Sequence, residues 1–518
     1  MLADSPDGGG SEWPPDASEG RAFLLQRAKR KRSARTVAWA GDTSRLLEEV
    51  ASEANLALAL INVLRNRGAP VLDGQTVEEA EAQAPKPLPR LRRALLKGCY
   101  RPGDVPRVFI PKPGGGQRGL GIPNVIDRVA RQAVLQVLEP VFEPTIHPSS
   151  HGFRPRRGAM TAIAEAKEHL KAGYRTVVDL DLAQFLDRVH HQRLLDPYRS
   201  AGGGSSGGRL VRLMLKAAAV MPDGTRIIVR EGTPQGGPLS PLLSNIVLDE
   251  LDWELTRRGH RLVRYADDCN VFVGGARAGA RVMASTTKFP ERRMRLQVNA
   301  AKSAVRHPSK AHFLGFRFLL RQDGEIGILL WAKTERRLAA TIRQMTPSNW
   351  GRSITACMDG LSRYLTGWMA HYRLCSADAI KGSGVIDAHI RRRIRAIIVR
   401  QKKRPRFLLR HLLALGVGRS AAAGAAYCAR GAWHRSNRPA LTRAYRRPGS
   451  SDDWPRSRRA GKSSTPHRHR TSSRWRCDRS TQRAGCGPAS PVLCVRGAVE
   501  QSIAPTRRLR RGVSFRCR

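Results

Sequence analysis

Two adjacent aspartates, Asp267 and Asp268, stand between two short apolar runs, and this feature constrains the fold more than any other. Residues 261–265 precede the pair and residues 269–274 follow it, and both runs contain Val with Leu or Phe. Such residues favour strands, so the segment is predicted to form two strands that meet at a tight turn. Neighbouring carboxylates at that turn would repel each other and lose hydration. A divalent cation removes this cost, and hard oxygen ligands suit Mg²⁺.

A second acidic strand end lies upstream. Residues 175–182 are predicted to form a strand that carries Asp179 and Asp181 near its end, and Asp187 follows shortly after. A glycine-rich segment over 232–238 separates the two acidic strands, and glycine lets a backbone approach a ligand closely. A lone pair of aspartates at a turn is usually a solvated hairpin. Three such elements in this order instead indicate a functional site.

These three elements resemble motifs A, B and C of the right-hand polymerase palm, and the Tyr-x-Asp-Asp form of the last is typical of reverse transcriptases. Further segments resemble one branch, the bacterial group II intron reverse transcriptases with their maturase domain. The segments that carry this resemblance are Ile110–Pro113, Arg118–Pro123, Ser150–Pro155, Asn299–Ser303, Phe313–Phe316, Tyr364–Trp368 and Arg391–Arg395. The resemblance runs from about residue 46 to about residue 445.

The resemblance implies an α+β fold, with a right-hand fingers–palm core and a helical maturase or thumb domain. The predicted domains are a disordered basic leader over 1–43, a reverse transcriptase fingers–palm domain over 44–325, a maturase/thumb domain over 345–447 and a disordered basic tail over 448–518. Local patterns add strands at 108–110 and 226–229, helices at 127–142 and 241–255, a flexible glycine-serine insertion at 202–208, and a mostly helical stretch over 349–399.

The resemblance also implies the catalytic chemistry. Asp181 and Asp267 would hold two Mg²⁺ ions about 4 Å apart, and Asp268 would support the same cluster. One ion would activate the primer 3′-hydroxyl, and the other would steady the leaving pyrophosphate. Lys302 is the candidate proton donor to the leaving group, with a plain surface lysine as the alternative. Asp179 and Asp187 are interpreted as structural.

Other motif residues are predicted to bind the nucleotide. Lys112 and Arg118 would clamp the incoming triphosphate, since basic groups stabilise phosphoryl oxygens. Gln235 would contact the nucleotide or the template, and a loop-capping role is the alternative. Leu186 stands where the family has an aromatic residue that blocks the ribose 2′-hydroxyl, so sugar discrimination is expected to be weaker. If Phe185 fills this space instead, sugar discrimination is not expected to be weaker.

RNA contacts are predicted at five arginines. Arg154 is one candidate, with a structural ion pair as the alternative. The others form a basic cluster in the maturase-like block, and they are Arg391, Arg392, Arg393 and Arg395. Several Lys or Arg side chains on one helix are expected to give strongly salt-dependent RNA binding.

The overall charge agrees with a nucleic-acid partner. Lys and Arg number 92 against 42 Asp and Glu in 518 residues, a formal net charge of +50. An anionic membrane is the competing partner, but no apolar run of about 18 residues is present to span one. The nine cysteines form no Cys-x-x-Cys pair, which favours a reduced cytoplasmic setting in which the protein associates with the nucleoid or a ribonucleoprotein. The implied partners are a group II intron RNA, a DNA target or primer, and dNTPs, while the oligomeric state stays open.

Two other functions remain open from the sequence. One is a splicing-only maturase whose polymerase has decayed, which the intact carboxylates oppose and which Leu186 and Lys402 favour, since Lys402 falls where the family often has tryptophan. The other is a reverse transcriptase of a different bacterial retroelement or defence system. The maturase-like block over 364–406 argues against this second alternative.

Overall fold

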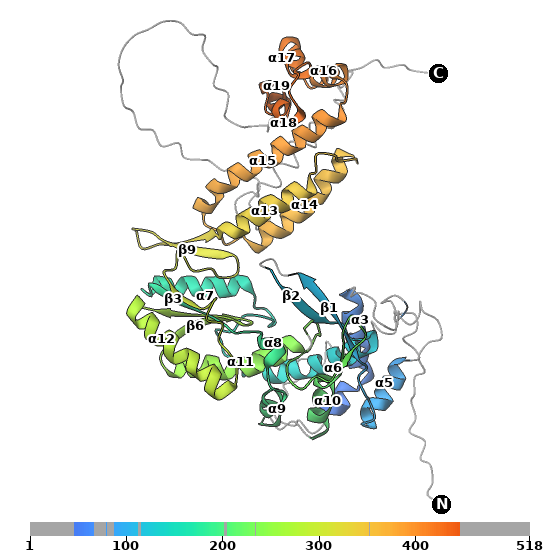
Figure 1. Ribbon diagram of the computed structural model, residues 1–518, viewed down its shortest axis with the longest axis vertical. Helices are drawn as coiled ribbons and strands as arrows, with labels where there is room; N and C mark the ends of the chain where they lie inside the picture. The colour runs from blue at the N-terminus through green and yellow to red at the C-terminus, as the bar shows by residue number, and fades with distance from the viewer. Residues whose placement is uncertain are drawn as a thin grey trace, which may run out of the picture. The chain divides into compact units, whose positions relative to one another are not determined.

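The computed structural model describes residues 46–66, 79, 87–111, 115–200, 205–233, 235–351 and 353–445 (Figure 1). The chain divides into two compact units, and the division falls between Ile326 and Gly327. The predicted leader over 1–43, the predicted tail over 448–518 and the candidate nucleotide ligand Lys112 lie outside the described residues.

A four-stranded sheet in the order β6-β7-β3-β8 forms the palm of the first unit. Its strands are β3 (Thr176–Asp181), β6 (Arg261–Tyr265), β7 (Asp268–Val273) and β8 (Ala304–Arg306), and every neighbouring pair is antiparallel. The register of β6 and β7 sets Tyr265 opposite Asp268, so Ala266 and Asp267 form a two-residue turn. The predicted pair of strands with a tight turn is confirmed.

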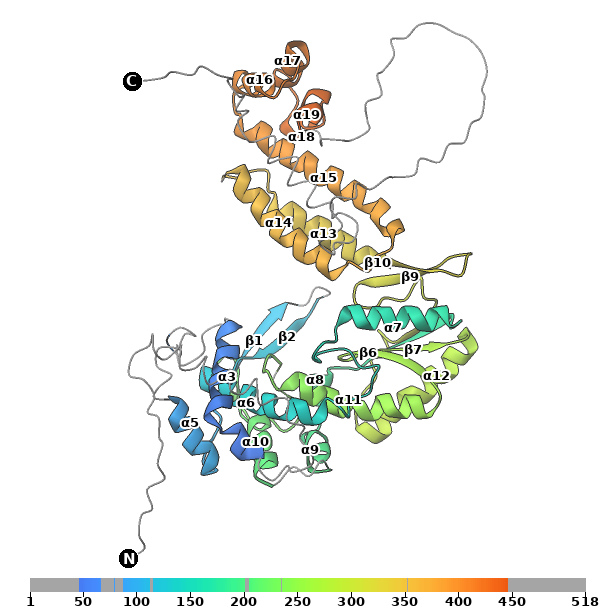
Figure 2. The same cartoon turned by 180° about the vertical axis from the view of Figure 1, so that it is seen from behind.

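The two faces of this sheet are covered differently. Side chains alternate along a strand, so Thr176 and Val178 share one face of β3 while Val177 and Asp181 share the other. Helix α12 (Ala276–Phe289) packs against the first face, and α7 (Ala159–Lys171) contacts β6. Figures 1 and 2 show α7 and α12 on opposite sides of these strands. The far end of the second face, where Asp181 lies, is therefore left for the functional site.

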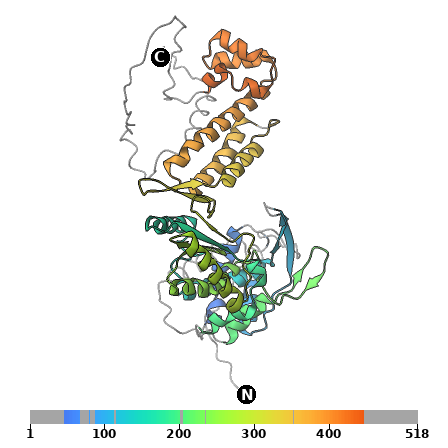
Figure 3. The ribbon, with the colours of Figure 1, turned by 60° about the vertical axis from the view of Figure 1, so that its left-hand side comes forward.

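A second sheet, in the order β2-β1-β4-β5, belongs to the fingers. Its members are β1 (Val105–Pro111), β2 (Gln117–Gly121), β4 (Ala219–Val220) and β5 (Arg226–Ile227). Two antiparallel hairpins, β1-β2 and β4-β5, are joined by a short parallel pairing of β1 with β4 (Figure 3). The strands predicted at 108–110 and 226–229 are both present, the first longer than expected and the second shorter.

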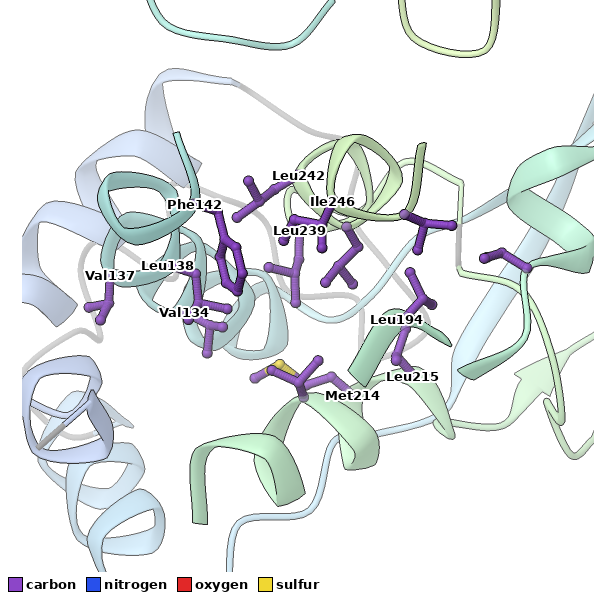
Figure 4. Close-up of a cluster of buried hydrophobic side chains, with 14 of the residues drawn as sticks. Val134, Val137, Leu138, Phe142, Leu194, Met214, Leu215, Leu239, Leu242 and Ile246 are labelled. Carbon is purple, nitrogen blue, oxygen red and sulfur yellow. The ribbon is translucent and has the colours of Figure 1, made fainter. Parts of the chain in front are cut away.

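Helices pack around one apolar core in this unit. They are α2 (Leu46–Val50), α3 (Glu53–Arg65), α5 (Pro87–Leu96), α6 (Val125–Phe142), α8 (Phe185–Arg188), α9 (His191–Ser200), α10 (Ser205–Leu215) and α11 (Ser240–Arg257). Figure 4 shows Phe142, Leu194, Met214, Leu239 and Ile246 meeting where α6, α9, α10 and α11 converge, and all five are buried. Burial of each such side chain stabilises the fold by ~1.5–3 kcal/mol. The helices predicted over 127–142 and 241–255 are confirmed.

The predicted glycine-serine insertion over 202–208 is partly wrong, because residues 205–208 form the first turn of α10. The helix is amphipathic, and Leu210, Val211, Met214 and Leu215 are all buried in the core. Tertiary packing of this apolar face outweighs the helix penalty of about 1 kcal/mol for each glycine. Residues 201–204 lie outside the described part of the chain.

The second unit is helical after β10 (Ile326–Leu330), which follows β9 (Phe316–Leu320) along the chain. Its helices are α13 (Ala332–Met345), α14 (Ile354–His371), α15 (Ala377–Gln401), α16 (Pro405–Ala414), α17 (Arg419–Ala426), α18 (Ala432–Arg435) and α19 (Pro439–Ala444). The unit has its own apolar core, which includes Leu338, Ile342, Leu361, Ile394 and Leu408. The predicted helical stretch over 349–399 is confirmed. None of the helices in the described residues is long and apolar enough to cross a membrane.

Candidate active site

Two of the predicted catalytic carboxylates are held next to each other by strand pairing. Asp181, the last residue of β3, is the direct cross-strand partner of Asp268, the first residue of β7. Directly opposed residues of an antiparallel pair have Cβ atoms only about 5 Å apart. Asp267 immediately precedes Asp268 in the β6-β7 turn. Folding thus brings motif A and motif C to one end of the palm sheet.

Lys302 lies beside these carboxylates. Its Nζ is 3.0 Å from Oδ2 of Asp181 and 3.3 Å from Oδ1. The surrounding loop also binds the backbone of Asp181, because Asn299 donates its N–H to the Asp181 carbonyl and Ser303 Oγ accepts the Asp181 N–H. Lys302 therefore acts as the counter-ion of Asp181 in this structure, and its role as a proton donor stays a prediction.

Negative charge is in excess at this end of the sheet. The pKa of Asp268 is raised to about 7, first by loss of hydration and then by repulsion from Asp267, Asp181 and Asp179, while Lys302 opposes the shift. Asp268 keeps an exposed side-chain surface, so solvent screens part of this repulsion between like charges. A bound cation would relieve this repulsion.

Asp179 and its partner form the adjoining ion pair. Arg306 Nη1 lies 2.6 Å from Oδ2 of Asp179. Burial raises the pKa of Asp179 and Asp181 adds to the rise, while the charge and hydrogen bond of Arg306 lower it. The structural role predicted for Asp179 agrees with this side-chain ion pair.

The donor set fits Mg²⁺. Asp181, Asp267 and Asp268 offer hard carboxylate oxygens, and protein Mg²⁺ sites commonly use one or two carboxylates together with water and substrate phosphates. Within the described residues, no three His, Cys, Asp or Glu side chains form a ready-made metal cage. The ammonium of Lys302 holds Asp181 instead, so a metal ion would have to exchange with that ion pair.

The raised pKa predicts a pH-dependent effect of Asp268→Asn on the metal-free protein. An acid whose pKa is higher in the folded than in the unfolded chain binds more protons when folded, so stability falls as pH rises between the two values. For Asp268 this window runs from 3.8 to about 7. In EDTA, the Asn variant should therefore melt at a higher temperature than the wild type at pH 8, with a difference that vanishes towards pH 4.

Thermal unfolding in EDTA across this pH range checks the expectation. Addition of Mg²⁺ should reverse the order at pH 8, because the wild type then gains more from the bound ion than the variant does. An equal difference in melting temperature at every pH would contradict the assignment of the repulsion to ionised Asp268.

The catalytic turn is braced by a buried arginine that the sequence did not single out. Arg264 has no exposed surface, and its Nε donates to both carboxylate oxygens of Asp252 on α11, at 2.9 and 2.8 Å. Its Nη1 donates to the carbonyl of Ala266, within the turn, and to Oδ1 of Asn245, each at 2.9 Å. The guanidinium thus ties the helix that follows the glycine-rich segment to the turn that carries Asp267.

The turn also rests on the segment that contains Gly152. A Cβ at Gly152 would lie 2.4 Å from the Ala266 backbone nitrogen, so only glycine fits there. Asn245 Nδ2 donates to the Gly152 carbonyl at 2.8 Å, which links this contact to the same network. Ala266 has a positive φ of 59°, a strained conformation for a residue with a side chain. An arginine inside an otherwise apolar strand was the available signal for this network.

The glycine-rich segment packs on the short helix that follows Asp181. Gly232 has φ of 80°, and a Cβ there would lie 2.6 Å from the Asp187 carbonyl oxygen. Gln235 Nε2 donates to Oδ2 of Asp187 at 2.9 Å, while Arg107 Nη2 lies 3.5 Å from Oδ1 of the same carboxylate. Asp187 therefore connects motif A, motif B and strand β1, and it orients the side chain predicted to contact the nucleotide.

The other residues that are predicted to bind the nucleotide differ in how far they are buried. Leu186 is partly buried against the core, whereas Phe185 is 3% exposed and belongs to that core. Arg118 is exposed on β2. Lys112 lies outside the described residues, and the nucleotide-binding roles of all three side chains stay predictions.

Arg154 is engaged within the fold. Its side chain is buried, with Nη2 2.9 Å from a carboxylate oxygen of Glu143 and Nη1 donating to the carbonyls of His147 and Ser150. This arrangement favours the structural ion pair over the RNA contact predicted as its alternative. A buried and satisfied guanidinium has no free donor face for a phosphate.

Two of the predicted RNA-binding arginines in the second unit point inward. Arg395 is 7% exposed and donates Nε to the Ser436 carbonyl at 2.8 Å, and loss of hydration lowers its pKa to about 10. Arg393 donates to the hydroxyl and the carbonyl of Thr346, both at 2.6 Å. These side chains therefore hold helices of the unit together.

The other two predicted arginines, Arg391 and Arg392, also contact side chains of the same unit. Arg391 forms an ion pair with Asp387 at 2.7 Å, and the guanidinium of Arg392 stacks 4.0 Å from the centre of the Trp433 ring. Arg391 and Arg392 are half-buried. RNA binding by these four arginines stays a prediction, and a run of arginines in a sequence does not reveal which side chains face the core.

Two families match the chain. The reverse transcriptase (RNA-dependent DNA polymerase) family matches residues 110–318, and the group II intron maturase-specific domain matches residues 335–414. These segments lie on either side of the division between the two compact units. The first contains all three carboxylates, the glycine-rich segment and Lys302.

Individual relatives agree with the two families. Protein YkfC of Escherichia coli K12 is 32% identical over 61% of this chain and 91% of its own length. The group II intron-encoded protein LtrA of Lactococcus lactis is 27% identical over 52% of this chain and 55% of its own length. The retron Mx65 reverse transcriptase of Myxococcus xanthus is 28% identical over 51% of this chain and 62% of its own length. The chain therefore belongs to the group II intron reverse transcriptase and maturase family, whose enzymes are RNA-directed DNA polymerases.

Proposed function

We propose that this protein copies RNA into DNA at the palm carboxylates, with two Mg²⁺ ions as cofactors. The observation that carries the proposal is the cross-strand pairing of Asp181 with Asp268, next to Asp267 in the braced turn. These three side chains would hold the metal. When bound, the ions would activate the primer 3′-hydroxyl and neutralise charge on the transferred phosphoryl group and the departing pyrophosphate.

The remaining residues of the site have binding and proton-transfer roles in this proposal. Lys112 and Arg118 bind the triphosphate of a dNTP through charge-assisted hydrogen bonds. Gln235, oriented by Asp187, contacts the nucleotide or the template strand. Lys302 stands beside Asp181, and its ammonium is available to donate a proton to the pyrophosphate once a metal ion has replaced it.

The proposed partners are a group II intron RNA and a DNA target that supplies the primer. The match of the second unit to the maturase-specific domain supports an RNA-folding role in splicing, followed by copying of the same RNA at an insertion site. The net charge of +50 supports a polyanionic partner. We place the protein in the cytoplasm, in a ribonucleoprotein with this RNA or at the nucleoid.

Primer extension by the purified full chain tests the proposal. With an RNA template, an annealed DNA primer and dNTPs, we expect extension that requires Mg²⁺ and stops in EDTA. A protein that binds RNA and promotes intron splicing but extends no primer would instead be a splicing-only maturase. Extension on DNA templates alone would also contradict the proposal.

Leu186→Phe should improve the discrimination between dNTPs and ribonucleotides. An aromatic ring at this position forms a rigid wall against a 2′-hydroxyl, whereas leucine leaves part of that volume empty. Phe185 is held in the core and is not free to fill it. Pocket sterics of ~1–3 kcal/mol correspond to roughly 10- to 200-fold in selectivity, so a gain within that range is expected.

Single-nucleotide insertion with matched dNTP and ribonucleotide gives the two kcat/KM values whose ratio measures this selectivity. Leu186→Met, which keeps a flexible side chain of similar volume, is the control and should leave the ratio near that of the wild type. An unchanged ratio in Leu186→Phe would show that another residue forms the sugar gate.

A further inference from the structure

A basic hollow of about 530 Å³ lies on the palm unit, where the end of α11, helix α12 and the π-helix η1 (Pro290–Met294) meet. We call this site the basic hollow. Its cations are Arg258, Arg281, Lys288, Arg292 and Arg293, with Phe289 among them. Among the described residues no acidic side chain lines it, although the nearby Glu291 is exposed on η1.

Three of these cations are free to bind a ligand. Arg281, Lys288 and Arg292 are exposed, and within the described part of the chain none has a hydrogen-bond or ion-pair partner. Arg281 and Lys288 are seven positions apart on α12, which places them on one face of that helix, and Arg292 continues the row into η1. A solvated charged surface normally mixes both signs, whereas here one sign converges.

The other two cations of the basic hollow are paired with carboxylates. Arg258 pairs with Glu254 at 2.7 Å and lies 5.6 Å from the centre of the Phe289 ring. Arg293 lies 3.7 Å from a carboxylate oxygen of Glu250. Arg258 and Arg293 are therefore already partnered, in contrast to Arg281, Lys288 and Arg292. The irregular π-helical turn is also of a kind that is frequent at functional sites.

The basic hollow is separate from the catalytic carboxylates. A Cβ at Gly279 of α12 would lie 3.2 Å from Thr176 Cγ2 and 3.6 Å from Val178 Cγ2, so α12 covers the face of β3 that carries these two residues. Asp181 projects from the opposite face, because side chains alternate along a strand. A duplex at Asp181 therefore leaves the basic hollow open to a second nucleic-acid segment.

We propose that the basic hollow binds the phosphodiester backbone of RNA on the back of the palm, outside the catalytic cleft. Clustered Lys and Arg side chains bind phosphates and release the counterions of the nucleic acid. A hollow of 530 Å³ with a row of three free cations can contact several phosphates of one strand. The choice of RNA as the nucleic acid rests on the proposed function.

Salt-dependent binding of RNA by the full chain tests this site. The catalytic cleft is first saturated with an unlabelled RNA–DNA primer–template, and a fluorescent RNA hairpin is then titrated at several KCl concentrations. The variant carries Arg281→Ala, Lys288→Ala and Arg292→Ala. At about 0.9 of slope for each neutralised phosphate, log affinity against log salt should flatten by about two to three units.

A matched variant controls for the loss of three charges. Arg261→Ala, Arg277→Ala and Lys310→Ala remove two arginines and one lysine that are exposed in the same unit outside the basic hollow. The control should flatten the slope much less, and both variants should extend a short primer–template as the wild type does. Equal slopes in the two variants would overturn the proposal.

Two further readouts separate the ways in which the inference can fail. A DNA hairpin of the same sequence should lose a similar slope, because its backbone carries the same charge, and a larger loss for DNA than for RNA would overturn the assignment to RNA. A wild-type protein that extends no primer would contradict the proposed polymerase function, whereas the hollow is judged by the slope alone.

Discussion

Asp267→Asn is expected to abolish primer extension, with a loss of about 10³-fold or more. The substitution keeps the size of the side chain and removes one carboxylate charge from the proposed metal site. Metal ions contribute several kcal/mol of charge stabilisation in the transition state, and each 1.36 kcal/mol corresponds to about tenfold in rate. RNA affinity should stay unchanged, because it comes from Lys and Arg. Steady-state primer extension and RNA titration measure the two quantities.

Asp223→Asn is the matched control for this prediction. Asp223 is another exposed aspartate at a hairpin turn, between β4 and β5, and its Oδ1 accepts the N–H of Thr225 at 2.9 Å, which an asparagine can also do. The control should extend primers normally. Full activity of Asp267→Asn would remove this side chain from the catalytic site, and a parallel loss of RNA affinity would indicate damage to the fold.

Arg264→Met is expected to destabilise the palm unit by about 3–5 kcal/mol, because it leaves the buried carboxylate of Asp252 without its partner. The double variant Arg264→Met with Asp252→Leu should recover most of this stability, since paired apolar replacements of a buried ion pair are often neutral. Both variants should nevertheless extend primers about 10²-fold more slowly than the wild type. The carbonyl of Ala266 loses its donor in each, and small displacements of catalytic groups have effects of that size.

Chemical unfolding and primer extension together separate structural from positioning roles here. A double variant that recovers both stability and activity would show that Arg264 only stabilises the fold. Arg261→Met, at the exposed first residue of the same strand, is the control and should change neither quantity. The Mg²⁺ concentration at half-maximal activity should rise in the double variant, because the turn that presents Asp267 is less firmly held.

The sequence by itself determined the local elements and the identity of the catalytic motifs. The strands around Asp267 and the helices over 127–142 and 241–255 could be predicted, because apolar periodicity and tight turns depend on neighbouring residues. Two acidic segments and one glycine-rich segment likewise resembled, in their order, the motifs of a polymerase palm. These signals are contained in short segments, so no knowledge of distant contacts was needed to read them.

Tertiary structure decided which charged side chains are free. Arg154 and Arg395 look in the sequence like any surface arginine, and Arg264 differs only in lying within a strand. All three are nevertheless buried against hydrogen-bond partners that folding supplies. Burial of a charge depends on whether folding supplies a carboxylate or carbonyl at hydrogen-bond distance, and no local pattern encodes that. The basic hollow could not be predicted from local patterns either, because its cations converge only when α11, α12 and η1 pack together.

The cross-strand register is the other property that only the fold decided. A shift of one residue between β3 and β7 would move Asp181 away from Asp268, and either sequence alone permits that shift. The register is fixed because Val178 and Val271 must face the apolar core together, while Val177 and Phe272 face the other side. Apolar packing along the two strands thus places the carboxylates opposite each other at their ends.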